Sequence, residues 1–118
     1  MIHSIEGYQI FLASDHVDMR KSIDGLVAIV QASFRMDPFS SALFVFTDRK
    51  RKKIKILQWD HNGFWIHYKR LETGRFRWPQ KNDFQTISIS RRQLNWLMDG
   101  LELQQKHAHA PCSATLAV

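Results

Sequence analysis

The spacing of apolar residues changes once along this chain, and that change restricts its fold more than any other feature. From Ile23 to Phe34 apolar side chains recur at intervals of three and four residues, which is the spacing of one face of an amphipathic helix. A helix is therefore expected from about Asp18, and the carboxylate of Asp15 or Asp18 can cap its first amides. Asp37-Pro38 should end it, because a residue before proline is disfavoured in the helical conformation.

After Pro38 the apolar residues come in short runs separated by turn residues, which is typical of strands. Asn62-Gly63 favours a type I′ turn, because both residues tolerate a positive φ. The pattern predicts an antiparallel meander of four strands at residues 43–47, 53–59, 64–71 and 75–78. Further strands are expected at residues 8–13 and 85–89.

The C-terminal part of the pattern predicts a second helix. Ser90 and Gln93 have the spacing of a capping box. The apolar positions that follow form one helical stripe: Leu94, Leu97, Met98 and Leu101. We therefore expect an α+β fold, with an antiparallel β-meander of four or more strands flanked by an N-terminal and a C-terminal amphipathic helix. Residues 1–105 are expected to form a single domain, and residues 106–118 a flexible tail.

Composition limits the class of protein. Hydrophobic residues make up 44% and charged residues 24% of the chain, as in ordinary folded domains, so intrinsic disorder is disfavoured. No apolar run reaches the roughly 18 to 20 residues of a membrane span. The N-terminus lacks the pattern of a secretory signal, and the single cysteine, Cys112, cannot form an internal disulfide. These features predict a cytoplasmic protein without a membrane partner.

Positive charge is concentrated in the middle of the chain. The formal net charge is +6, and residues 49–77 hold ten basic and two acidic residues, whereas residues 1–48 hold three and six. Such a concentration is expected of a surface that binds phosphate. A charged loop can also serve solubility or prevent aggregation at a sheet edge. The predicted nucleic-acid contacts begin with a run at the first hairpin turn: Arg49, Lys50, Arg51, Lys52 and Lys53.

Strand alternation extends this predicted surface. Period-two alternation places Phe64, Ile66, Tyr68 and Arg70 on one side of their strand, a side that we expect to be mostly core. The opposite side would form one cationic face with an aromatic ring able to stack on a base. Its members are Lys53, Lys55, Trp65, His67, Lys69, Arg75 and Arg77. Trp65 could instead cover a small second core beneath a loop. All of these residues except His67 belong to the predicted nucleic-acid set. Arg70, on the other side of the strand, also belongs to this set.

Nothing in the sequence predicts catalysis, a metal site or a cofactor. The aspartates are scattered and mostly occupy positions typical of caps and turns. His107, His109 and Cys112 lie close together near the C-terminus, but no second set of ligands accompanies them. Glycine-rich phosphate loops are absent from the sequence. We therefore expect a protein that is not an enzyme.

Several short blocks of the sequence match a known family in order and spacing. They include Asp18-Met19-Arg20-Lys21, Asp37-Pro38-Phe39-Ser40, Leu43-Phe44-Val45-Phe46 and the tract from Tyr68 to Pro79. Over about residues 10–103 the chain resembles the small TnpB accessory protein of the sixty-six-type bacterial insertion sequences. The resemblance implies a mobile-element protein encoded beside a larger transposase, which carries the catalytic carboxylates. It implies no catalytic residues for this chain.

Two hypotheses of function remain. The first is a non-catalytic accessory factor of transposition that binds DNA through a basic β-hairpin surface and assists the transposase. The second is a protein adaptor that binds the transposase without contacting DNA, through the motif that contains Asp18, Arg20 and Lys21 and through the aromatic strands. The oligomeric state is left open by the sequence.

Overall fold

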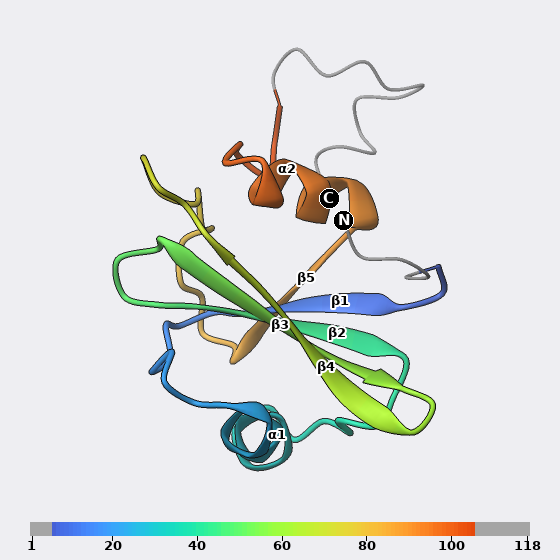
Figure 1. Cartoon of the computed structure of the whole chain (residues 1–118). Coiled ribbons are helices and arrows are strands. Elements are labelled where there is room, and N and C mark those ends of the chain that lie inside the picture. Colours follow the sequence, from blue (N-terminus) through green and yellow to red (C-terminus); the bar gives the residue numbers. More distant parts are fainter. Residues whose placement is uncertain (1–5, 106–118) are drawn as a thin grey trace.

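The structure is a computed structural model that describes residues 6–105. The predicted flexible tail, with His107, His109 and Cys112, lies outside the described residues. The chain adopts an α+β fold with a five-stranded, mostly antiparallel sheet and two helices (Figure 1). In chain order the elements are β1 (Gln9–Ala13), α1 (Ile23–Ala32), β2 (Ala42–Thr47), β3 (Lys53–Asp60), β4 (Gly63–Arg70), β5 (Thr86–Ile89) and α2 (Arg91–Met98).

The strands lie in the order β4-β3-β2-β1-β5. β1 and β2 are parallel, because α1 carries the chain back across the sheet before β2 begins, and the other neighbouring pairs are antiparallel. The continuous meander therefore has three strands, β2 to β4. The predicted strand at residues 75–78 is wrong, because those residues pair with no strand. Phe76 is instead buried in the core, and its N–H donates to the carbonyl of Arg51 at 2.7 Å.

Both faces of the sheet are covered, with α1 and α2 on opposite sides (Figure 1). On the α2 side Leu94 and Leu97 pack in one cluster with Ile54 and Ile56. The cluster on the α1 side contains Leu26, Val30, Phe44, Phe46 and Leu57. All six residues of β2 are buried, and the residues before Thr47 form a continuous apolar run rather than an alternation.

The two helices are shorter than their patterns predict. α1 begins after Ser22, not near Asp18, and it ends several residues before Asp37-Pro38. The capping box of α2 is confirmed, because Ser90 Oγ accepts from Gln93 N–H at 3.0 Å and Gln93 Oε1 accepts from Ser90 N–H at 2.9 Å. Leu101 does not belong to the α2 stripe, because the helix ends at Met98 and the Leu101 side chain is exposed.

The turn between β3 and β4 differs by one residue from the prediction. Asp60 pairs with Gly63, so the turn residues are His61 and Asn62, and His61 has the positive φ of 58°. This register places Trp59 opposite Phe64 and aligns apolar side chains on the α1 side of the sheet. Burial of these side chains therefore outweighs the preference of Asn62-Gly63 for a type I′ turn.

Three loops lie together at one end of the strands, and we call this surface the loop edge. It consists of residues 14–22 after β1, 48–52 after β2 and 71–85 after β4. Backbone hydrogen bonds join these loops to one another or to strand ends. Val17 N–H donates to Thr47 O at 2.9 Å, and Leu71 N–H donates to Lys52 O at 2.8 Å. Connections from distant parts of the sequence therefore form one continuous surface.

Candidate nucleic-acid interface

The loop edge brings together most of the predicted nucleic-acid residues. β2 and β4 both end there, and β3 begins there, because β3 is antiparallel to both neighbours. The predicted residues at this edge are Arg49, Lys50, Arg51, Lys52, Lys53, Arg70, Arg75 and Arg77. The remaining three, Lys55, Trp65 and Lys69, lie within strands.

Asp48 determines the shape of the basic loop between β2 and β3. Its Oδ1 accepts from the backbone N–H of Lys52 at 2.8 Å and of Lys53 at 3.1 Å. The Asp48 carboxylate therefore bonds backbone amides of the loop. The side chains of Arg49, Lys50 and Lys52 are exposed and form no hydrogen bond or ion pair with any described residue.

Arg51 anchors the same loop and has an unusual side chain. Its backbone adopts a positive φ of 61°, and its carbonyl accepts the bond from Phe76. Nη1 of its guanidinium is buried and has no hydrogen-bond partner within residues 6–105. Buried polar groups are normally paired, so this nitrogen is an exception among the described residues.

The other arginines of the loop edge are exposed. Arg70 Nε donates to Glu72 Oε2 at 2.9 Å, and this hydrogen bond raises the pKa of Arg70. Arg77 Nη1 lies 3.9 Å from Glu102 Oε1. Exposed ion pairs of this kind contribute little to stability, so both cations can exchange their partners for phosphate at small cost. Arg75 is exposed and forms no ion pair with a described residue.

Two of the predicted lysines bond backbone carbonyls. Lys55 Nζ donates to Met19 O at 2.7 Å and to Lys21 O at 2.9 Å. Lys69 Nζ donates to Met98 O at 2.8 Å, at the C-terminal end of α2, where unpaired carbonyls and the helix dipole favour a cation. The two lysines therefore attach a loop and a helix to the sheet.

The prediction of one cationic face is wrong. Lys55 pairs with Tyr68 in the β3–β4 register, so Lys53 and Lys55 lie on the same face as Tyr68 and Arg70. Trp65, His67 and Lys69 lie on the opposite face, with Ile54 and Ile56. The prediction failed because β3 contributes to both cores, Ile56 on one side and Leu57 on the other. Alternation alone could not define a single inward side.

Trp65 stands apart from the cations of the loop edge. It lies five residues before Arg70, about 16 Å away at the rise of an extended strand. Its side chain is 56% exposed, so it does not cover a second core, and its Nε1 donates to Asp60 Oδ2 at 3.1 Å. The ring stacks on His67, whose Nε2 lies 2.8 Å from Gln58 Oε1. Desolvation by burial lowers the pKa of His67.

The predicted partner-binding residues also lie at the loop edge. Asp18 accepts from the backbone N–H of Arg20 at 2.9 Å and from its Nη2 at 2.7 Å, and these bonds hold the pKa of Asp18 well below its ordinary value. A hollow of about 600 Å³ opens beside them. Its lining residues are Asp18, Met19, Arg20, Asp48, Lys53, Lys55 and Tyr68. Lys21, the third predicted partner residue, is exposed and does not line this hollow. The sequence did not indicate that Tyr68 belongs there, because its strand face was assigned to the core.

Within residues 6–105, no group of three or more histidine, cysteine, aspartate or glutamate side chains could hold a metal ion. No helix in the described part of the chain is long and apolar enough to cross a membrane.

Residues 8–108 match the family described as IS66 Orf2 like protein. The chain belongs to the IS66 Orf2-like family. Its relatives include the uncharacterized protein y4hO of Sinorhizobium fredii (strain NBRC 101917 / NGR234), which is 33% identical over 102 residues, 86% of this chain and 88% of y4hO. The uncharacterized protein y4jC of the same strain is 31% identical over 102 residues, 86% of each chain. No solved structure matches the chain.

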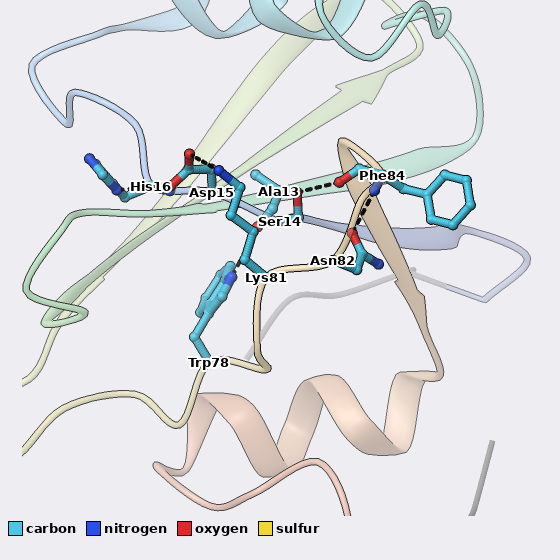
Figure 2. Close-up of polar contacts among 8 residues, drawn as sticks. All are labelled: Ala13, Ser14, Asp15, His16, Trp78, Lys81, Asn82 and Phe84. Atoms are coloured by element: carbon cyan, nitrogen blue, oxygen red, sulfur yellow. Dashed lines mark hydrogen bonds and ion pairs between the residues drawn. The ribbon is translucent and has the colours of Figure 1, made fainter.

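The family confirms the resemblance found in the sequence and implies an insertion-sequence accessory protein. The matched residues include the whole loop edge of this IS66 Orf2-like protein. The part of that edge after β4 is fixed by contacts that the sequence did not predict (Figure 2). Trp78 Nε1 donates to Ala13 O at 2.9 Å, and Lys81 Nζ lies 3.0 Å from Asp15 Oδ2. The hydrogen bond from Lys81 is the largest cause of the lowered pKa of Asp15.

Proposed function

We propose that this protein is a non-catalytic accessory factor of transposition that binds DNA through the loop edge and thereby assists the separate transposase. The basic loop between β2 and β3 is the observation that supports it most. Asp48 fixes the loop from within, so three exposed cations, Arg49, Lys50 and Lys52, are left without an intramolecular partner among the described residues. A fixed loop loses little conformational entropy when its cations bind phosphates.

The proposed contact set is the loop-edge part of the predicted one: Arg49, Lys50, Arg51, Lys52, Lys53, Arg70, Arg75 and Arg77. Contacts to phosphate fix a protein on DNA without reading its sequence, so the proposed binding has low sequence specificity. Lys55 and Lys69 support this edge from within the fold, and Trp65 lies outside the proposed contact.

Fluorescence anisotropy with a labelled DNA duplex over a series of salt concentrations tests the proposal. We expect tight binding at low salt and a steep loss of affinity as salt rises, because phosphate contacts release counterions. The double variant Lys50→Ala/Lys52→Ala should flatten the slope of log affinity against log salt by roughly 2, since each lost contact removes about 0.9.

The matched control removes two exposed cations outside the loop edge, Arg35→Ala/Arg91→Ala. Its formal charge equals that of the first double variant, so a general effect of net charge would change both slopes equally. We expect the control to retain the slope of the unmodified protein. Absence of duplex binding at low salt, or equal effects of the two double variants, would exclude the loop edge as the DNA site.

The hollow beside Asp18 favours a second candidate function, that of an adaptor for the transposase. It combines the Asp18–Arg20 ion pair with the Tyr68 side chain, which is 54% exposed. Co-purification with the transposase after nuclease digestion distinguishes the candidates. Association that survives digestion and is lost in Arg20→Ala, but not in Arg35→Ala, supports the adaptor. Association that disappears with the nucleic acid contradicts it.

A further inference from the structure

The outer side of β4 is a long and regular sheet edge. All eight residues of β4 pair with β3 in one unbroken register, from Asp60–Gly63 to Lys53–Arg70. β4 contains no proline and no bulge, and no other strand within residues 6–105 pairs with its outer side. β5 at the opposite edge has only four residues. Proteins usually shorten, bulge or cover such edges, because an open edge is a template for another strand.

Alternation identifies the backbone groups that face outward. Leu71 N–H donates to Lys52 O at 2.8 Å, which continues the β3–β4 register by one pair. In an antiparallel ladder the hydrogen-bonded pairs alternate, so the odd-numbered residues of β4 bond to β3. The N–H and C=O groups of the even-numbered residues, Phe64, Ile66, Tyr68 and Arg70, point away from the sheet.

The side chains along this edge are largely apolar and accessible. Trp65 is 56% and Tyr68 54% exposed, and they lie on opposite faces of β4. Phe64 and Ile66 are half-buried and pack against the core on the α1 side. A strand added here would cover apolar surface on both faces of the sheet while satisfying the outward backbone groups.

We propose that β4 pairs with β4 of a second copy of this chain, antiparallel and with His67 on the two-fold axis, so that the two sheets form one continuous sheet. In this register Lys69 lies opposite Trp65 of the second copy and Arg70 opposite Phe64. Tyr68 lies opposite Ile66. Both cations of the strand therefore lie opposite aromatic residues and not opposite each other, which favours the pairing.

The distribution of charge along β4 selects a second copy as the occupant. Both cations are at one end of the strand, Lys69 and Arg70, and the aromatic residues Phe64 and Trp65 are at the other. Antiparallel self-pairing places the cationic end of one β4 beside the aromatic end of the other. A parallel in-register arrangement would set like charges side by side, which is destabilising. The two-fold contact uses the same surface on both copies and closes at the dimer.

Sedimentation equilibrium of the full chain over a range of micromolar concentrations tests the proposal. We expect a dimer that dissociates on dilution. Tyr68→Pro removes an outward N–H and leaves the bonds to β3 intact, so it should weaken dimerisation about tenfold or more. A mass of one chain at every concentration would overturn the proposal.

Ser88→Pro is the matched control, at the other edge of the sheet. β5 pairs antiparallel with β1, and Ser14 N–H donates to Gln85 O at 2.9 Å. The odd-numbered residues of β5 therefore bond to β1, and the N–H of Ser88 points outward. We expect Ser88→Pro to dimerise as the unmodified chain does. Circular dichroism spectra identify any variant that has lost its fold. Equal weakening by two folded proline variants contradicts the assignment to β4.

Cysteine cross-linking tests the register without a proline, in a background in which the single cysteine is replaced, Cys112→Ser. Facing residues of a non-hydrogen-bonded pair have Cα atoms about 4.5 Å apart, within the range of a disulfide. His67→Cys should therefore form a covalent dimer under mild oxidation, and Ser88→Cys should not. Cross-linking through Ser88→Cys alone would overturn the proposed interface. Cross-linking through Ile66→Cys in preference to His67→Cys would overturn the register.

Discussion

Lys69 Nζ lies 2.8 Å from the carbonyl oxygen of Met98, and this hydrogen bond joins the edge strand β4 to the C-terminal end of α2. The residue belongs to the basic segment of the chain, and charge together with strand alternation assigned it to the predicted nucleic-acid set. Its position at a helix end shows that part of the positive charge of this segment stabilises the fold. The same holds for Lys55, which bonds the carbonyls of Met19 and Lys21.

Lys69→Met is predicted to destabilise the protein by about 1 kcal/mol, because it removes a charge-assisted bond at a helix C-terminus and keeps most of the side-chain volume. Urea unfolding measures this free energy. Lys52→Met is the control, since the exposed Lys52 side chain has no partner among the described residues and should change stability by less than about 0.5 kcal/mol. Equal effects of the two variants would show that the bond to Met98 contributes nothing.

Lys55→Met is predicted to loosen the loop before α1, because both carbonyls that Lys55 holds belong to it. Amide hydrogen exchange at residues 18–22 should become about tenfold faster or more, while exchange in the β2–β3 ladder stays slow. Exchange measured by NMR for individual amides checks this. Unchanged exchange in residues 18–22 would mean that other contacts hold this loop.

The Asp48→Asn variant distinguishes two explanations of DNA affinity, because they predict opposite changes in that affinity. Net charge alone predicts tighter binding, because a negative charge is removed from a basic loop. We expect weaker binding, by about threefold to tenfold, because a neutral side-chain amide accepts less strongly than a carboxylate from the N–H groups of Lys52 and Lys53, and the loop would lose its fixed shape. Anisotropy with duplex DNA measures the change.

Glu72→Gln is the control for Asp48→Asn. It removes an acidic group that pairs with Arg70 and makes no bond to a backbone amide of the basic loop. DNA affinity should therefore increase modestly in this variant. If Asp48→Asn also binds DNA more tightly, the shape of the basic loop has no importance for affinity.

The Asp18–Arg20 pair predicts a dependence of stability on pH. The pKa of Asp18 is lowered in the folded protein, so the stabilisation is present above the unfolded value near 3.8 and is lost as pH falls through the lower folded value. NMR titration of the Asp18 carboxyl should show its pKa moving up toward 3.8 in Arg20→Gln. The difference in urea midpoint between Asp18→Asn and the unmodified protein should shrink below about pH 4. A difference that is constant with pH would contradict a role for the charge.

Local patterns in the sequence predicted much of the fold. The capping box of α2 and the apolar runs of β2 and β3 depend on neighbouring residues, and the structure contains these elements. The parallel pairing of β1 with β2 could not be predicted, because it depends on where α1 packs. The supposed strand at residues 75–78 failed because burial of Phe76 and the bond to Arg51 fix that segment without a partner strand.

The candidate site was also predicted only in part, because some of its features depend on neighbouring residues and others on distant contacts. The run from Arg49 to Lys53 is a local signal, and the structure places its first four residues on a loop and Lys53 at the start of β3. Whether Lys55 or Lys69 faces solvent depends on the register and on what covers each face of the sheet. With Ile54 and Ile56 in one core and Leu57 in the other, period-two alternation has no unique interpretation. The contacts of Trp78 and Lys81 with the end of β1 span more than 60 residues, beyond the reach of any motif.

A helix packs on each broad side of the sheet, and the proposed contacts with other macromolecules lie at two rims of residues 6–105. One rim consists of connecting segments rich in cations, and another is the flank of a single long strand. These two rims meet where that strand ends, at Arg70. A nucleic acid at the first and a protein at the second would therefore be near neighbours, and mutations at that corner are the place to look for communication between them.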